Sequence, residues 1–227
     1  MSLEITILFA EQGDVDAQRY LGDCYRYGEG ITQDYEKAIE WYTKAAEQGD
    51  VTAQFNLGLM YGNGEEITKD AAKSVYWYTK AAEQGDVDAQ RNLGCTYYRG
   101  DGVKQNYKEA VKWLTKAVEQ GDYFACDDLG TMYYKGYGVE RDHAKAVELW
   151  TKPAEQGDVY AQRYLGDRYK NGEGVTQDYA KAVYWYTKAA EQGDSSACID
   201  LGDMYEEGYG VEQDHAKAVE WWKKAAE

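Results

Sequence analysis

The stretch Ala17–Gly49, AQRYLGDCYRYGEGITQDYEKAIEWYTKAAEQG, contains two helix-like segments joined by a glycine-rich turn. The same pattern returns along the chain at a fixed distance. The Leu-Gly pair that begins at Leu21 occurs six times, with a step of 36 residues. The glycine that closes the stretch keeps the same period, at Gly13, Gly49, Gly85, Gly121, Gly157 and Gly193. Copies in such strict register indicate an array of repeats.

Each repeat is expected to form two helices, at about residues 15–27 and 35–48 in the first copy. Both segments carry an apolar stripe at helical spacing. The stripes consist of Ala17, Leu21 and Tyr25 in the first helix and Ala38, Trp41, Tyr42 and Ala45 in the second. Two such helices cannot bury their stripes alone, so the repeats must stack side by side. The sequence therefore predicts an all-α solenoid of six helix-turn-helix repeats.

Glycine has two different roles in this pattern. Gly49 suits the left-handed position that ends a helix, and Asp50 directly after it is a good N-cap for the next one. Gly22 and its copies fall in the middle of a helix, where glycine costs about 0.5–1 kcal/mol relative to alanine. Their recurrence predicts that a neighbouring helix approaches closely at that point. The large aromatic residues of the second helices are assigned to packing between helices.

The repeats divide the whole chain. Residues 1–13 match the end of a second helix and are expected to cover the array as a partial leading helix. The six repeats are expected at about residues 14–49, 50–85, 86–121, 122–157, 158–193 and 194–227. The chain stops inside the last second helix without a polar cap. Two interpretations stay open: a fragment of a longer array, or an end that associates with a second copy of the chain.

Composition restricts the partners. The chain of 227 residues has 25 basic and 41 acidic side chains and a net charge of −16. Such a charge disfavours nucleic acid and favours a partner with basic residues. No apolar run approaches the roughly 20 residues that span a bilayer, so no membrane partner is expected. Glu4 stands where a signal peptide would be basic, which favours a cytoplasmic protein unless an upstream segment carries a signal. The four cysteines form no C-x-x-C pair and are expected to be reduced structural thiols.

The motifs for catalysis, cofactors and metals are missing. The G-x-G turns lack the third glycine and the preceding strand of a phosphate loop, and they lack the ligand ladder of a calcium loop. His143 and His215 stand 72 residues apart, two repeats from each other. No Ser-x-x-Lys, His-Glu-x-x-His or G-x-S-x-G pattern occurs. We therefore predict no catalytic residue, no cofactor and no metal site.

The quoted stretch closely resembles the Sel-one-like repeat, a 36-residue relative of the tetratricopeptide repeat. The matching motifs are A-x-x-x-L-G-x-x-Y, G-x-G, D-x-x-K-A, W-Y-x-K-A-A and the closing glycine, and they cover about residues 10–227. The resemblance implies a right-handed superhelix whose first helices line a concave groove. It also implies an adaptor that assembles protein complexes. Some cysteine-rich relatives are linked to β-lactam binding or hydrolysis, but their paired cysteines are absent here.

Three departures from the pattern stand out. Glu66 replaces the second glycine of the turn in the second repeat. In the fourth repeat Leu149-Trp150 replaces Trp-Tyr, and Pro153 lies near the end of the second helix. Because proline removes a backbone hydrogen bond, we expect this helix to be kinked or shortened. The fourth repeat either bends the superhelix or has drifted without consequence.

A second face of each first helix, spaced i, i+3, i+7 and i+10, is left free by the apolar stripe. In the first repeat this face consists of Asp16, Arg19, Asp23 and Arg26. Its residues change from repeat to repeat while the stripe stays constant. That separation is typical of proteins in which recognition is added to a constant scaffold.

This variable face is predicted to be a peptide- or protein-binding groove. The middle repeats add apolar and aromatic side chains to it without an evident packing role, namely Phe55, Leu59, Tyr98, Phe124 and Tyr134. By the resemblance to tetratricopeptide grooves, Asn56 and Asn92 would hold a peptide backbone. The predicted groove residues are Arg19, Phe55, Asn56, Leu59, Arg91, Asn92, Tyr98, Phe124, Asp127, Tyr134, Arg163 and Asp167.

The sequence thus favours a non-catalytic scaffold that binds a peptide or protein segment. Two alternatives belong to other classes. One is a hydrolase-like enzyme that acts on cell-wall or β-lactam-type substrates. The other is a purely structural repeat module of a larger protein.

Overall fold

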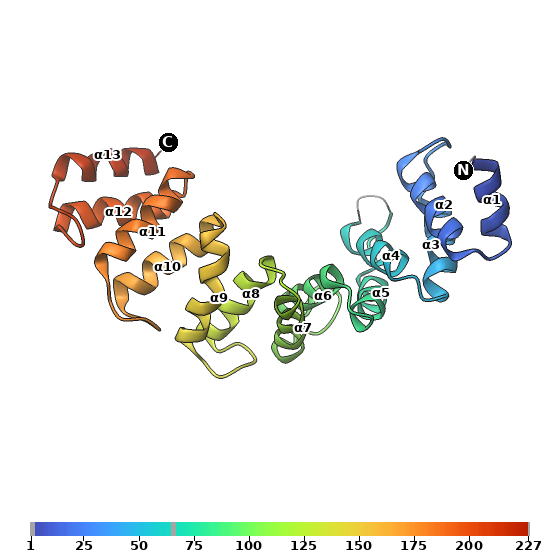
Figure 1. The fold of residues 1–227 in the computed structure, drawn as a ribbon, viewed down its shortest axis with the longest axis horizontal. Coiled ribbons are helices and arrows are strands. Elements are labelled where there is room, and N and C mark those ends of the chain that lie inside the picture. The colour runs from blue at the N-terminus through green and yellow to red at the C-terminus, as the bar shows by residue number, and fades with distance from the viewer. Residues whose placement is uncertain (1–2, 65–66, 227) are drawn as a thin grey trace. The chain divides into compact units, whose positions relative to one another are not determined.

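A computed structural model describes residues 3–64 and 67–226, which form thirteen α-helices and no strand (Figure 1). The short helix α1 (Leu3–Glu11) comes first. The first helices of the repeats are α2 (Val15–Tyr27), α4 (Val51–Asn63), α6 (Val87–Arg99), α8 (Phe124–Lys135), α10 (Val159–Asn171) and α12 (Ser195–Glu207). The second helices are α3 (Tyr35–Glu47), α5 (Ala71–Glu83), α7 (Tyr107–Glu119), α9 (His143–Glu155), α11 (Tyr179–Glu191) and α13 (His215–Ala225). The predicted all-α repeat solenoid is confirmed.

The helices group into two compact units, Met1–Gln120 with α1–α7 and Gly121–Glu227 with α8–α13. Within each unit every helix packs against the next one along the chain. In the first unit α4 also touches α6, the next first helix. No helix in the described part of the chain combines the length and apolar character needed to cross a bilayer.

Short polar signals start and end the helices as predicted. Asp50 caps α4, since its carboxylate accepts a hydrogen bond from the backbone N–H of Ala53 at 2.7 Å. Gly49 before it has a φ of 97°, in the left-handed region that favours glycine. The turn glycines Gly28 and Gly30 both have a φ of 74°. Because both glycines adopt the left-handed backbone conformation, the G-x-G motif is explained as a turn between helices. Glu66, which breaks this motif, lies outside the described residues.

The mid-helix glycines hold the two helices of a repeat close together. A β-carbon on Gly22 would lie 2.5 Å from Cδ1 of Tyr42, the fully buried ring of α3. In the third repeat the ring is replaced by Leu114, 2.7 Å from the same point on Gly94. The predicted close approach is therefore confirmed, and the partner is the side chain that follows the tryptophan of the W-Y motif.

Glutamine side chains join successive repeats, a role that the sequence analysis did not assign. Nε2 of Gln48 donates to Oε1 of Gln18 at 2.8 Å and to the carbonyl of Gly13 at 3.2 Å. Nε2 of Gln18 in turn donates to the carbonyl of Ala10 at 3.0 Å. The same arrangement recurs at Gln54–Gln84, Gln90–Gln120 and Gln162–Gln192. Each pair donates a hydrogen bond to a carbonyl group at the end of the preceding helix, because the last carbonyl groups of a helix have no N–H partner within it.

Pro153 does not shorten its helix, so of the two expected effects the shortening was wrong, and the kink stays a prediction. Helix α9 has thirteen residues, the same number as α3. Proline near the C-terminal end removes only one backbone hydrogen bond. Its own carbonyl accepts the N–H groups of Gln156 and Asp158, both at 3.0 Å, which completes the helix end. In the same helix Trp150 occupies the position against Gly130 that tyrosine fills in other repeats.

Substitution of Gly166 by alanine is expected to lower the free energy of unfolding by about 1–3 kcal/mol, the usual cost of overpacking a core. Its β-carbon would lie 2.5 Å from Cδ1 of the buried Tyr186. This steric cost exceeds the gain in helix propensity. The exposed Ser196→Ala variant is the control, with an expected change within about 0.5 kcal/mol. Chemical denaturation measures both. A Gly166→Ala protein as stable as the wild type would contradict the close-packing account.

Candidate peptide-binding face

The predicted groove residues all lie on first helices, seven in the first unit and five in the second. The first unit holds Arg19, Phe55, Asn56, Leu59, Arg91, Asn92 and Tyr98. The second unit holds Phe124, Asp127, Tyr134, Arg163 and Asp167. Phe124 is 56% exposed, and the other eleven are half-buried. The face is therefore accessible to solvent, while most of its side chains also contact neighbouring residues.

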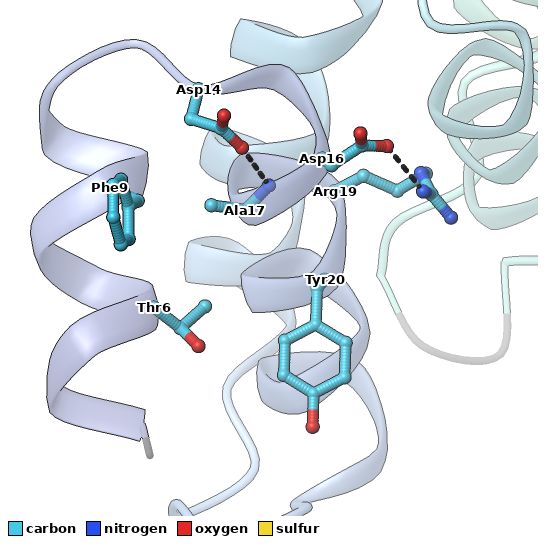
Figure 2. Close-up of a pocket in the computed structure, with 7 residues that line it drawn as sticks. All are labelled: Thr6, Phe9, Asp14, Asp16, Ala17, Arg19 and Tyr20. Atoms are coloured by element: carbon cyan, nitrogen blue, oxygen red, sulfur yellow. Dashed lines mark hydrogen bonds and ion pairs between the residues drawn. The ribbon is translucent and has the colours of Figure 1, made fainter. Parts of the chain in front are cut away.

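The arginines of this face tie neighbouring repeats together. Arg19 pairs with Asp16 at 2.8 Å, as Figure 2 shows, and its Nε lies 3.2 Å from Oδ2 of Asp50. Since Asp50 is the N-cap of α4, Arg19 holds the start of the next repeat. Arg163 makes the equivalent contact with the cap residue Asp194 at 3.5 Å. These arginines combine a structural contact with an accessible guanidinium.

The aromatic side chains also contribute to packing, which corrects the expectation that they had no such role. Phe55 packs on the core of the first unit, with its ring centroid 5.9 Å from that of Tyr78. Tyr98 lies 5.8 Å from Tyr107. Asn56 is engaged as well, because its carbonyl oxygen accepts from Nη1 of Arg26 at 3.4 Å.

A polar cavity of about 340 Å³ opens on this face in the first unit. The variable face supplies Gly62 and Cys95, and the predicted groove residue Asn92 also lines the wall. Cavities of 300–1,000 Å³ are the usual size of binding pockets, so this one suits a small group or one side chain. The remaining lining residues are Asn63, Lys69, Ala71, Ser74, Tyr78, Thr96, Arg99 and Asp101.

A hollow of about 630 Å³ at the start of the chain touches the face only through Asp16 and Arg19. Figure 2 shows Thr6 and Phe9 on α1 facing Ala17 and Tyr20 on α2 across it. Phe9 and Tyr20 are 43% and 47% exposed. This hollow is mainly a feature of the α1–α2 contact.

In the second unit Tyr134 is the centre of an aromatic and charged cluster. The guanidinium carbon of Arg168 lies 4.1 Å from the centre of the Tyr134 ring, a cation–π contact. The Tyr134 hydroxyl donates to Glu173 at 3.3 Å, and Arg168 pairs with Glu173 at the same distance. The ring of Trp150 lies 6.0 Å away. Arg168 is buried, so this cluster is largely preformed.

Asp127 stands where the first and fifth repeats have Arg19 and Arg163. Its neighbour across the repeat boundary is therefore a like charge, the cap residue Asp158. Burial, followed by the charges of Asp158 and Asp128, raises the pKa of Asp127 to about 6. Its Oδ1 atom is buried and has no hydrogen-bond partner among the described residues. The fourth repeat thus has, in place of an ion pair, a carboxyl group whose charged form is destabilised by burial and by neighbouring acids.

Asp167 shows a third arrangement, an internal hydrogen bond to the second helix. It accepts the hydroxyl proton of Tyr186 at 2.8 Å, and burial raises its pKa. Asp23 accepts from Tyr42 in the same way at 2.6 Å. The second repeat has Leu59 at this position, so Tyr78 cannot form the bond.

Sequence reasoning missed Tyr78, Arg168 and Ser74 as residues of the face. Tyr78 and Ser74 lie on a second helix, and they were assigned to packing or not considered. A signal was present: position-by-position alignment of the repeats places Leu59 at the position of Asp23 and Gly62 at that of Arg26. Among the described residues no group of three or more His, Cys, Asp or Glu side chains is placed to hold a metal ion.

Comparison with known families gives six matches to the Sel1 repeat. The matched segments are residues 15–50, 51–86, 87–122, 124–158, 159–194 and 195–227. They begin within about two residues of the repeats predicted from the sequence. A search of curated proteins returned no match.

Two solved structures are similar to this chain over most of its length. One is a protective antigen of uropathogenic Escherichia coli strains that displays an SLR fold, with 41% identity and a TM-score of 0.88. The match covers 100% of this chain but only 48% of the E. coli chain. The other is a Sel1 repeat protein of Oxalobacter formigenes, with 40% identity and a TM-score of 0.75. That match covers 94% of this chain and 86% of the other.

Replacement of Asp127 by asparagine is expected to stabilise the protein by about 3 kcal/mol at pH 7.5, because the pKa rises from 3.8 to about 6 and each unit corresponds to about 1.36 kcal/mol. The folded state holds the proton more tightly than the unfolded state. Stability from this group is therefore present at low pH and lost as the pH rises from about 4 through about 6.

Denaturation of both proteins between pH 4 and pH 8 measures this effect. The advantage of Asp127→Asn should shrink towards zero near pH 4. Glu140→Gln, at an exposed loop position, is the control and should show little difference at any pH. A constant difference across the range would show that the carboxyl charge is not its cause.

Proposed function

The chain belongs to the Sel1 repeat family, and we propose that it is a scaffold that binds a peptide or protein segment on the variable face of its first helices. Proteins of this family are generally protein-interaction scaffolds without catalytic activity. The finer assignment, to this face and these residues, is our proposal.

The observation that carries it is the contrast between a constant frame and a variable face. The Leu-Gly pair is present in all six repeats. The last position of the face, one helical turn after the Leu-Gly pair, holds five residue types of different size and charge in the six repeats: Arg26, Gly62, Tyr98, Tyr134, Lys170 and Glu206. A purely structural array would not need such diversity at half-buried positions. A binding face does, because each repeat then contacts a different part of the ligand.

The chemistry of the face supports an extended protein ligand. Tyr and Arg, which dominate binding hot spots, occur in both units, as Arg91 and Tyr98 in the first and Tyr134 and Arg163 in the second. The net charge of −16 supports a partner whose surface is basic overall. No observation favours the enzyme alternative. Cytoplasmic location stays a prediction.

Selection from a random peptide display library on the purified protein tests this function. A selected peptide should bind less tightly to Tyr98→Ala, by about tenfold or more, since hot-spot residues contribute above about 1 kcal/mol. Tyr76→Ala is the matched control, because Tyr76 is a 54% exposed tyrosine on the second helix α5. It should bind the peptide like the wild type.

Circular dichroism establishes that both variants are folded before calorimetry measures their affinity. Equal losses in the two variants would place the peptide elsewhere on the surface. Failure to select any peptide would favour a structural module without a peptide ligand of its own.

A further inference from the structure

The cavity of the first unit exists because the second repeat lacks a side chain that the first repeat has. Gly62 stands at the position of Arg26, which is buried and fills the equivalent space. A β-carbon on Gly62 would lie 2.8 Å from Oγ of Ser74, so even alanine would intrude on the cavity. Gly62 is a helical residue of α4 without a positive φ, and the turn has no conformational need for glycine here.

The hydroxyl group of Tyr78 lines this cavity without a hydrogen-bond partner among the described residues. Tyr78 is only 5% exposed, and its hydroxyl makes no hydrogen bond within residues 3–64 and 67–226. The neighbouring hydroxyls are occupied as donors, Ser74 to the carbonyl of Gly58 at 2.7 Å and Thr96 to that of Asn92 at 2.8 Å. The Tyr78 oxygen is not one of the fully buried atoms that lack a partner, so it is reached from the cavity and is free to donate to a bound group.

The other repeats show what kind of partner fits. The equivalent hydroxyls of Tyr42 and Tyr186 donate to carboxylates, Asp23 at 2.6 Å and Asp167 at 2.8 Å. In the second repeat Leu59 takes the place of that aspartate. The second repeat therefore has the hydroxyl donor, Tyr78, but no carboxylate acceptor, and the adjoining cavity is large enough to admit a carboxylate group.

The charged groups that act on Tyr78 among the described residues are the cations Arg26 and Arg91, although the chain as a whole is acidic. Burial raises the pKa of Tyr78 to about 12, and Arg26 and Arg91 oppose that rise. Among the described residues that line the cavity, Lys69 and Arg99 are cationic and Asp101 is acidic. The side-chain amide of Asn92 adds a further donor to the wall. Donors and cations together favour an anionic acceptor.

We propose that this cavity is a subsite for a carboxylate group of the ligand, which accepts a hydrogen bond from Tyr78 in place of the aspartate found in the first and fifth repeats. The inference rests on the proposed binding face and adds an acidic anchor to a ligand that is otherwise basic or polar. The carboxylate belongs either to an aspartate or glutamate side chain or to a chain terminus, since both present the same two oxygens.

Three capped or free tripeptides test the subsite by nitrogen–proton NMR titration of the whole chain. The probes are acetyl-Gly-Glu-Gly-amide, acetyl-Gly-Gln-Gly-amide and acetyl-Gly-Gly-Gly with a free carboxyl end. Signals of the Gly62 backbone and the Asn92 side chain should shift with a carboxylate probe and not with the glutamine probe. A shift with only one carboxylate probe assigns the source. Equal shifts with the glutamate and glutamine probes, or none with either carboxylate probe, would overturn the proposal.

Two variants connect the shifts to Tyr78. Tyr78→Phe keeps the ring and should weaken binding of the carboxylate probe by about tenfold, as expected for a lost charge-assisted hydrogen bond. Leu59→Asp restores the internal acceptor of the first repeat and should abolish probe binding. Tyr186→Phe, the same change in the fifth repeat, should leave it unchanged. If Leu59→Asp does not fold, Tyr78→Phe alone decides the question.

The outcome separates the subsite from the proposed function. Peptides selected by display that bind the face without any carboxylate preference would remove the subsite and leave the scaffold. Carboxylate probes that bind while display yields no peptide would instead support the cavity as a site for a small anion and count against the scaffold.

Discussion

The contact between a mid-helix glycine and a large side chain of the following helix sets the spacing on which the rest of each repeat depends. Gly22 against Tyr42 and Gly166 against Tyr186 leave no room for a β-carbon. Glycine in a helix is intrinsically unfavourable, by up to about 1 kcal/mol relative to alanine. The burial of a large side chain against the glycine, Tyr42 and Tyr186 among them, offsets that cost. The same close approach brings the tyrosine hydroxyl within reach of the first helix.

That reach explains how one frame leads to different hydrogen bonding in different repeats. Where Asp23 or Asp167 is present, the tyrosine hydroxyl donates its hydrogen bond to that carboxylate within the same repeat. Where Leu59 replaces the acid, the same frame presents an unpaired donor to a cavity. Stacking is maintained by other groups, the glutamine pairs and the arginines that hold the cap of the next helix. Substitutions on the face therefore change which polar groups are exposed there, and the contacts that hold the array together lie elsewhere.

Prediction from the sequence was strongest where a signal repeated and weakest where a residue stood alone. Six copies made the period, the helix pairs and the role of Gly22 readable, since chance does not produce such register. The shortening expected from Pro153 was wrong because the helix end is completed by the N–H groups of Gln156 and Asp158. Phe55 and Tyr134 seemed free of packing because their contacts come from other helices and not from their own stripe. The glutamine pairs were missed because both partners are polar residues outside the apolar pattern.

The sequence by itself determined the all-α repeat architecture, the helix limits and the division between constant and variable positions. These properties follow from local physics, the helical period and the capping preferences of aspartate and glycine. Only the tertiary structure decided which side chains of the variable face are satisfied and which are not. Whether Tyr78 finds an acceptor, or Asp127 a counter-charge, depends on residues 19 to 31 positions away that packing brings together. Hydrogen bonding and burial at such distances are properties of the folded arrangement, and no local pattern encodes them.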